Sequence, residues 1–163
     1  MIRAARPGDA AAIAAVYAPH VLTGTGTFEY DAPDAAEITM RMARVHDAGW
    51  PWLVAEIDGA VVGYAYASQF RDRPAYAQTC ENSVYVAATA HRRGVGRALI
   101  DALVIAARAA GFREMIAVIS DGGGNTASLG LHRACSFHEA GRLTKVGFKF
   151  ERWLDVVYMQ RSL

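Results

Sequence analysis

The segment that most constrains the fold is the basic, glycine-bearing stretch 91–97, which has the sequence His-Arg-Arg-Gly-Val-Gly-Arg. Directly before it, residues 83–86 have the apolar character of a buried strand. After it, apolar residues recur at helical spacing from Ala98 to Ala107, and Gly111 ends the pattern. The sequence therefore predicts a strand, a tight basic turn and a helix of about four turns in direct succession.

The start of this helix is a candidate anion site. Its first N–H groups have no intrahelical partner, and the helix dipole adds partial positive charge at the same end. Gly94 and Gly96 allow the backbone to approach a ligand closely, and Arg92, Arg93 and Arg97 add full charges. A solvated turn is the alternative interpretation. The spacing excludes a Walker loop, which needs Lys and then Ser or Thr after its last glycine, and a dinucleotide fingerprint, which needs a third glycine.

Composition limits the class of protein. The 163 residues, 53% hydrophobic and 20% charged, predict one globular domain over 1–163, and no apolar run reaches the roughly 18 residues of a membrane span. The amino terminus lacks the apolar core of a signal peptide, and with only two cysteines a reducing cytoplasm is expected. Cys80 and Cys135 are too few and too far apart for a metal site, so no metal is expected. A net charge of +1 gives no general attraction to nucleic acid.

Helices and strands alternate along the chain. Asp9 and Asp34 are predicted N-caps, Asp58 and Gly59 a hairpin turn, and the Thr-Gly stretch 23–27 a loop. A second loop, rich in aromatic and basic residues, is expected between the last two strands. This pattern predicts a mixed sheet with helices packed on it, an α+β fold or α/β sandwich. The predicted strands are 2–5, 52–57, 60–68, 83–86, 115–119, 137–142 and 156–159, and the predicted helices are 10–17, 35–47, 98–110 and 126–134.

These features together resemble a known family. The order of strand, basic Gly-x-Gly turn and helix, then strand, Asn-containing loop and short helix, resembles the GNAT superfamily of N-acetyltransferases. Segments 79–86, 128–132 and 146–155 further resemble its phosphinothricin and methionine sulfoximine acetyltransferase-like branch. The resemblance covers nearly the whole chain. It implies a mixed, mostly antiparallel central sheet with helices on both faces.

The resemblance implies acetyl-CoA as the acetyl donor. The basic turn would hold its pyrophosphate through backbone amides, and the preceding strand would pair with the pantetheine arm as an added strand does. Asn125 and Ser128 match polar contacts of the family, although Asn125 taken alone is a typical N-cap. The expected cofactor-binding residues are Val84, Tyr85, Val86, Arg92, Arg93, Gly94, Val95, Gly96, Arg97, Asn125 and Ser128.

Acetylation of an amine requires a group or a water chain that removes a proton, because an ammonium has no lone pair for attack. Glu81 is the first candidate base, since partial burial on its strand would raise its pKa; an exposed strand carboxylate is the alternative. His132 is the second candidate, although a lone histidine on a short helix is more often a packing residue. Tyr85 is a candidate acid for the departing thiolate or a core residue. No acetyl-enzyme is expected, because Cys80 has no adjacent histidine.

The loop 70–76 carries the candidate residues for acceptor recognition. The guanidinium forks of Arg71 and Arg73 suit a carboxylate or phosphinate, unless both pair with Asp72. Tyr76 is a candidate side-chain contact. The resemblance implies small amino-acid-like acceptors of the phosphinothricin, methionine sulfoximine or methionine sulfone type, acetylated at the α-amine.

Two further segments are assigned by resemblance. Phe28 and Glu29 correspond to the family's other substrate-side segment, with a core position as the alternative for Phe28. Lys149 and Trp153 are expected to reach the site from a second subunit, because proteins of this branch usually form homodimers.

The sequence thus predicts an acetyl-CoA-dependent N-acetyltransferase that transfers acetyl directly to a small amine. Two alternatives remain at this point. One is an acetyltransferase of a protein N-terminus or a polyamine, which the paired arginines disfavour. The other is a non-catalytic acyl-CoA-binding sensor, which would keep the basic turn but would need no base.

Overall fold

A computed structural model describes residues 1–121 and 123–163. Its centre is a seven-stranded sheet in the order β1-β2-β3-β4-β5-β7-β6. All neighbouring pairs are antiparallel except β4 and β5, which are parallel. The predicted mixed, mostly antiparallel sheet is confirmed. Its strands are β1 (Ile2–Ala4), β2 (Trp52–Ile57), β3 (Ala60–Gln69), β4 (Thr79–Val86), β5 (Glu114–Ser120), β6 (His138–Lys149) and β7 (Arg152–Ser162).

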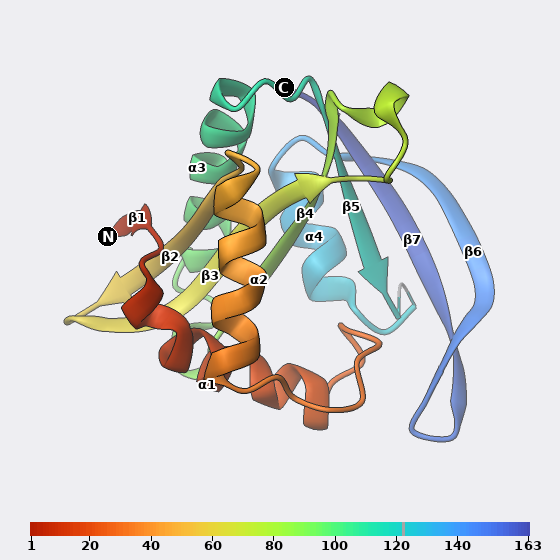
Figure 1. The fold of residues 1–163 in the computed structure, drawn as a ribbon. Coiled ribbons are helices and arrows are strands. Elements are labelled where there is room, and N and C mark those ends of the chain that lie inside the picture. Colours follow the sequence, from red (N-terminus) through yellow and green to blue (C-terminus); the bar gives the residue numbers. More distant parts are fainter. Residues whose placement is uncertain (122) are drawn as a thin grey trace.

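Helices cover both faces of the sheet (Figure 1). α1 (Ala10–Leu22) and α2 (Ala35–Asp47) pack on one face, and α3 (Val95–Ala109) and α4 (Thr126–Ala134) on the other. Short 3-10 helices lie at η1 (Pro7–Asp9), η2 (Pro74–Tyr76) and η3 (Ala88–Ala90). Within the described ranges, none of the helices has the length and apolarity needed to cross a membrane.

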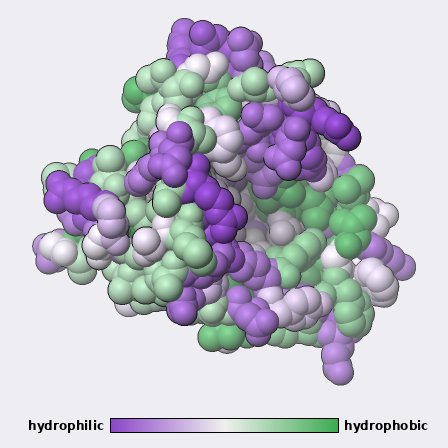
Figure 2. Space-filling view, in the orientation of Figure 1, coloured by the Kyte–Doolittle hydropathy of each residue, from purple (hydrophilic) through white to green (hydrophobic). Residues whose placement is uncertain are grey.

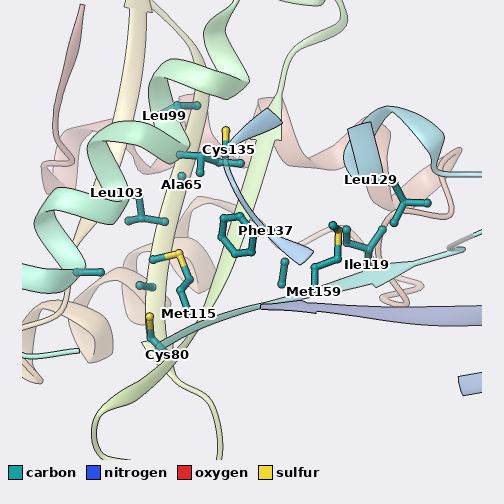
Figure 3. Packing of buried hydrophobic residues seen from close by; sticks show 14 of the residues in the cluster. Ala65, Cys80, Leu99, Leu103, Met115, Ile119, Leu129, Cys135, Phe137 and Met159 are labelled. Atoms are coloured by element: carbon teal, nitrogen blue, oxygen red, sulfur yellow. The ribbon is translucent and has the colours of Figure 1, made fainter. Parts of the chain in front are cut away.

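Each face of the sheet has its own hydrophobic core. Under α3, Leu99 and Leu103 meet Met115 of β5 and Met159 of β7 (Figure 3). Under α1 and α2, the core is built on Trp52, Val54 and Tyr64 of the sheet. α3 forms because its apolar residues repeat every three or four positions, so that one stripe faces the sheet. Its buried residues are Val95, Leu99, Ile100, Leu103 and Ala107.

β4 and β5 part in the middle of the sheet. Their parallel pairing runs from Thr79 opposite Glu114 to Asn82 opposite Ala117. Beyond this point β4 continues along β3 to Val86, and β5 continues along β7. Among the described residues, the other edge of 83–86 therefore has no strand partner. Apart from the Val86 carbonyl, which His20 and His91 contact, the backbone groups of this edge remain available to a ligand.

Asp9 and Asp34 both occupy the predicted N-cap positions, but only Asp34 makes the side-chain cap bond. The Asp34 carboxylate accepts a hydrogen bond from the N–H of Glu37 at 2.8 Å and caps α2. Asp9 makes no side-chain cap bond to α1, because Arg3 binds its carboxylate with two hydrogen bonds of 2.7 and 2.8 Å. α1 also runs past the predicted end at residue 17, since its buried stripe continues to Val21.

The loop predicted before the last strand is wrong. β6 and β7 form a long hairpin, closed by Phe150 and Glu151 with φ of 50° and 59°. Two consecutive positive φ values are typical of a type I′ turn, a position that Gly, Asn and Asp usually fill. The sequence therefore contains no recognisable turn signal here. Apart from Phe150 in the turn, the aromatic and basic residues of the predicted loop lie on the two strands.

Leu103→Ala is expected to lower the free energy of unfolding by about 2–5 kcal/mol, because Leu103 is fully buried between α3 and the sheet. Denaturant titration followed by circular dichroism measures the change. Ile105→Ala is the matched control on the same helix, where the side chain is 73% exposed and the expected change is within about 0.5 kcal/mol. Equal decreases in the free energy of unfolding of the two variants would contradict this assignment of the core.

Candidate active site

A cavity of about 1170 Å³ opens where β4 and β5 part. The space-filling view shows a recess near the middle of this face, between hydrophilic residues on one side and hydrophobic residues on the other (Figure 2). The wall is built by α1, residues 25–29, the ends of β4 and β5, the turn before α3, and α4. The structure therefore brings together elements from the whole length of the chain.

The basic turn forms one end of the cavity. Gly94, with φ of 78°, precedes α3, and Arg92 also has positive φ, at 58°. Arg92, Gly94, Val95, Gly96 and Arg97 line the wall, and Arg93 lies outside it. A Cβ at Gly96 would lie 3.0 Å from Cδ2 of Leu131 on α4, so this glycine allows two helices to pack closely. The N-terminus of α3, with its free N–H groups, faces the cavity.

The edge of β4 forms the second part of the wall. Ser83, Val84, Tyr85 and Val86 all line the cavity. The carbonyl of Val86 accepts hydrogen bonds from Nε2 of His20 at 3.1 Å and of His91 at 3.0 Å. Burial lowers the pKa of His20.

His20 is a wall residue that the sequence interpretation missed. It lies three positions after Tyr17 on α1, and Tyr17 also lines the cavity. The helical spacing of these two polar side chains was the available signal. Because the helix was predicted to end at residue 17, His20 lay outside the predicted helix.

Glu81 lies on the wall beside the loop 70–76. Its Oε2 is 3.8 Å from Nη1 of Arg71, and its side chain is one-third exposed. Burial raises the pKa of Glu81, and the positive charge of Arg71 opposes this effect only in part. Arg71 in turn packs over the ring of Phe70, with 4.1 Å from Cζ to the ring centroid. The site thus has a carboxylate of raised pKa next to a guanidinium.

His132 and Asn125 lie on the α4 side. Nδ1 of His132 lies 2.8 Å from the carbonyl of Ser128, so Nδ1 is the protonated nitrogen and donates. Its Nε2 accepts from the side-chain amide of Asn82 at 3.1 Å. Burial lowers the pKa of His132, and this imidazole is therefore neutral with its lone pair occupied. The Asn125 side chain accepts from the N–H of Ser128 at 3.3 Å, which confirms it as the N-cap of α4.

Tyr85 lies at the junction between the cavity and the core of α1. Its ring packs edge-on against Tyr17 with centroids 4.6 Å apart, and against His20 at 5.2 Å. Burial raises the pKa of Tyr85 well above its usual range. The phenol therefore stays protonated at neutral pH.

Glu29 differs from Glu81 in its electrostatic environment. Arg41 donates two hydrogen bonds to its carboxylate, at 2.7 and 3.1 Å, and Tyr17 donates a third at 3.0 Å. Burial alone would raise the pKa of Glu29, but these hydrogen bonds outweigh it and the pKa is lowered. Glu29 and its neighbour Phe28 both line the cavity.

Arg71 and the remaining expected substrate residues do not line the cavity wall. Arg73 and Tyr76 are on the exposed loop beside Glu81, and Trp153 is 61% exposed on β7. Lys149 differs from the expectation, since its side chain is only 1% exposed. Its ammonium binds carbonyls of its own chain, so this burial does not fit a contact with the site of a second subunit.

Comparisons with known proteins agree with this geometry. The model of the acetyltransferase (GNAT) domain matches residues 2–158. A phosphinothricin N-acetyltransferase of Alcaligenes faecalis is 52% identical over 162 residues, covering 99% of this chain and 82% of that protein. An L-methionine sulfoximine/L-methionine sulfone acetyltransferase of Pseudomonas aeruginosa is 37% identical, covering 99% and 94%.

A solved structure shows the same fold. The crystal structure of a phosphinothricin acetyltransferase from Sinorhizobium meliloti in complex with AcCoA has a TM-score of 0.95 and 43% identity, covering 100% of this chain and 88% of that one. The match extends over the whole of this chain. The chain belongs to the GNAT family of N-acetyltransferases.

Proposed function

We propose that the protein transfers the acetyl group of acetyl-CoA directly to the α-amine of a small amino-acid-like acceptor. The observation that carries this proposal is the position of Arg71 beside Glu81, with 3.8 Å between Nη1 and Oε2. An α-amino acid bears its carboxylate and its amine on the same carbon. A carboxylate bound by the guanidinium of Arg71 would therefore place the amine next to Glu81.

The donor side of the cavity has the features that acetyl-CoA requires. The N-terminus of α3 and the side chains of Arg92 and Arg97 offer backbone N–H groups and positive charge for the pyrophosphate. The free edge of 83–86 can pair with the amides of the pantetheine arm. The related protein of Sinorhizobium meliloti was solved with AcCoA, which supports the same donor here.

The proposed reaction has no covalent intermediate on the protein. Glu81 removes a proton from the acceptor ammonium, and the free amine attacks the thioester carbonyl. When the C–S bond breaks, Tyr85 donates its proton to the sulfur, which leaves as the CoA thiol. The acetylated nitrogen loses its second proton to the tyrosinate, and Glu81 releases the first proton to solvent, so that both groups return to their starting states. Burial raises the pKa of Cys80 to about 12, so this thiol is a poor nucleophile and supports direct transfer.

Glu81 is the proposed base in preference to His132. The Nε2 lone pair of His132 already accepts a hydrogen bond from Asn82. Burial also disfavours the cation that His132 would become. For Glu81, burial has the opposite consequence, because it raises the pKa and makes the carboxylate a stronger base.

The anionic acceptor is favoured over a polyamine or a protein N-terminus. Arg71 and Arg73 lie on one exposed loop beside Glu81, and neither alternative acceptor supplies a carboxylate near its amine. The names of the two relatives, for phosphinothricin and for methionine sulfoximine or sulfone, fit this class of acceptor. A non-catalytic sensor would have no use for a carboxylate of raised pKa beside its ligand.

The cellular location proposed is the cytoplasm. Cys80 and Cys135 are buried free thiols, which fits a reducing compartment.

Glu81→Gln is expected to lower kcat for methionine sulfone by about 10²- to 10⁴-fold, because the glutamine cannot accept the proton. For the unmodified protein, kcat/KM should rise with pH through the raised pKa of Glu81, since only the ionised form is active. Thiol release from acetyl-CoA measures both effects. Glu139→Gln, an exposed carboxylate on β6, is the matched control. An unchanged kcat in Glu81→Gln would contradict the assignment of the base.

Arg71→Ala is expected to raise KM for methionine sulfone by about 10- to 100-fold, since a hydrogen-bonded charge pair with the carboxylate is lost. The KM for acetyl-CoA should not change. An acceptor that lacks the carboxylate, 3-(methylsulfonyl)propylamine, should be used equally well by both proteins. Arg108→Ala on the exposed side of α3 serves as the control. An equal rise in KM for both acceptors would show that Arg71 does not bind the carboxylate.

A homodimer is the proposed assembly, formed through the exposed apolar surface of the β6–β7 hairpin. Hydrophobic residues gather over this hairpin in Figure 2, and a patch of this kind is typical of an interface. A second chain of the same protein is the partner that fits this surface best, because two identical hairpins can form an isologous interface. The patch consists of Leu143, Val146, Phe148, Phe150 and Trp153, which are 45%, 50%, 48%, 50% and 61% exposed.

Trp153→Glu is expected to convert the dimer to a monomer, because a charge would have to be buried at the interface. Light scattering after size-exclusion chromatography measures the mass. The exposed residue Met40 lies on α2, away from the hairpin, and Met40→Glu should leave the mass unchanged. A single-chain mass for the unmodified protein at micromolar concentration would refute the dimer.

A further inference from the structure

Lys149 is a buried cation that the proposed reaction does not use. Its side chain is 1% exposed, although lysine is almost never fully buried without partners. Its Nζ donates to the carbonyls of Val21 at 2.7 Å, Gly24 at 3.0 Å and Thr27 at 3.0 Å. The three N–H bonds of the ammonium thus meet three acceptors, so the desolvated charge is fully hydrogen-bonded.

The position of these carbonyls explains why a cation is needed there. Val21 is in the last turn of α1, where carbonyl groups have no intrahelical partner and the helix dipole is negative. Gly24 and Thr27 belong to the loop that follows. The ammonium of Lys149 therefore holds the end of α1 and this loop together. The loop is followed directly by Phe28 and Glu29, which line the cavity.

β6 holds the same segment by direct packing. A Cβ at Gly147 would lie 2.2 Å from Cζ of Phe28, so the ring of Phe28 lies directly against the backbone of β6. The hydroxyl of Tyr30 also donates to the carbonyl of Phe148. Residues 28–30 are thus fixed to β6 on both sides of Glu29.

A third link joins the loop to β7. Thr25 donates through Oγ1 to the carboxylate of Asp121 at 2.6 Å, and Arg152 donates to the same carboxylate at 3.2 Å. Asp121 is itself buried. The links from Lys149, Gly147 and Asp121 are independent of one another, and all of them connect segment 21–30 to the tip of the hairpin or to the end of β5.

The held segment is in contact with the proposed catalytic groups. The Oγ1 of Thr27 lies 2.7 Å from the hydroxyl of Tyr17, which donates to Glu29. The ring of Tyr17 packs against Tyr85, the proposed acid. A shift of Thr27 or Phe28 would therefore alter the wall on the acceptor side of the cavity while leaving the turn before α3 in place.

We propose that Lys149 and Gly147 of β6 are positioning residues for the acceptor: they fix segment 24–29 in the conformation that lets Phe28 and Glu29 form the acceptor side of the cavity. Neither residue touches the acceptor itself. This inference rests on the proposed function, because the acceptor-side role of Phe28 and Glu29 is part of it.

The kinetic test uses Lys149→Met and Gly147→Ala with methionine sulfone and acetyl-CoA as substrates. Lys149→Met removes the ammonium, and Gly147→Ala displaces Phe28 while keeping the ammonium and its three acceptors. Each variant is expected to raise KM for methionine sulfone about fivefold or more and to leave KM for acetyl-CoA within about twofold. Lys145→Met is the matched control, because Lys145 is the other lysine of the chain and is exposed on the same hairpin.

A second measurement follows the segment itself. Hydrogen exchange read by mass spectrometry should be faster over residues 21–30 in both variants than in the unmodified protein, and unchanged over α2. Lys145→Met should behave as the unmodified protein. If Lys149→Met does not fold, the kinetic and hydrogen-exchange results for Gly147→Ala alone test the proposal.

The outcomes separate the two proposals. If the unmodified protein does not acetylate methionine sulfone, the proposed acceptor class fails, and exchange over 21–30 still tests whether β6 fixes the segment. If the unmodified protein is active and the folded variants keep KM for methionine sulfone within about twofold, the positioning role is overturned. A fall in kcat with both KM values unchanged would also overturn it, because that result indicates only loss of folded protein.

Discussion

The parting of β4 and β5 after Asn82 and Ala117 is the constraint on which the rest of the site depends. Asn82 is the last residue of β4 that pairs with β5, and its side-chain amide binds His132 of α4. Beyond it, backbone groups that would satisfy each other in a continuous sheet become the wall of a cavity. The same parting brings the start of α3 and the start of α4 to one opening, since each helix is next to one of the two diverging strands. A sheet paired along its full length would leave the basic turn on a closed surface.

Two carboxylates on this wall have opposite electrostatic environments. Burial dominates at Glu81, where the nearest guanidinium nitrogen is 3.8 Å away, and the pKa rises. Burial also acts to raise the pKa of Glu29, but the hydrogen bonds and positive charge of Arg41, with the hydrogen bond of Tyr17, together outweigh it, and the pKa falls. The raised pKa makes the Glu81 carboxylate the stronger base, whereas the lowered pKa favours the anion at Glu29. Such a division of protonation states within one cavity is typical of sites that move protons.

Local chemistry was predictable from the sequence, and long-range partners were not. The basic turn and the Asp34 and Asn125 caps follow from short patterns whose causes lie within a few residues. The arrangement of the central sheet was instead implied by the family resemblance. Asp9 stands at the N-cap of α1 without the cap bond, because its carboxylate binds Arg3 of β1 and the N–H of Arg6. His20 could have been found from its helical spacing to Tyr17, had the helix been predicted to continue past residue 17. Asn82 reaches the cavity at a strand parting that no local pattern encodes.

The turn and the register of the β6–β7 hairpin were not predictable from the sequence. Phe150 and Glu151 turn the chain without a turn signal, and this register decides which side chains of β6 face inward. Gly147 and Lys149 are two positions apart and both meet segment 21–30, whereas Phe148 between them is exposed beside Trp153. Side chains on a strand alternate between its faces, so one face of β6 holds the acceptor side of the cavity and the other presents the apolar patch. A slip of one residue would exchange the two sets and place the ammonium of Lys149 on the outer surface. The buried ion therefore specifies the register of the hairpin, and through the register it also specifies which aromatic side chains lie on the outside.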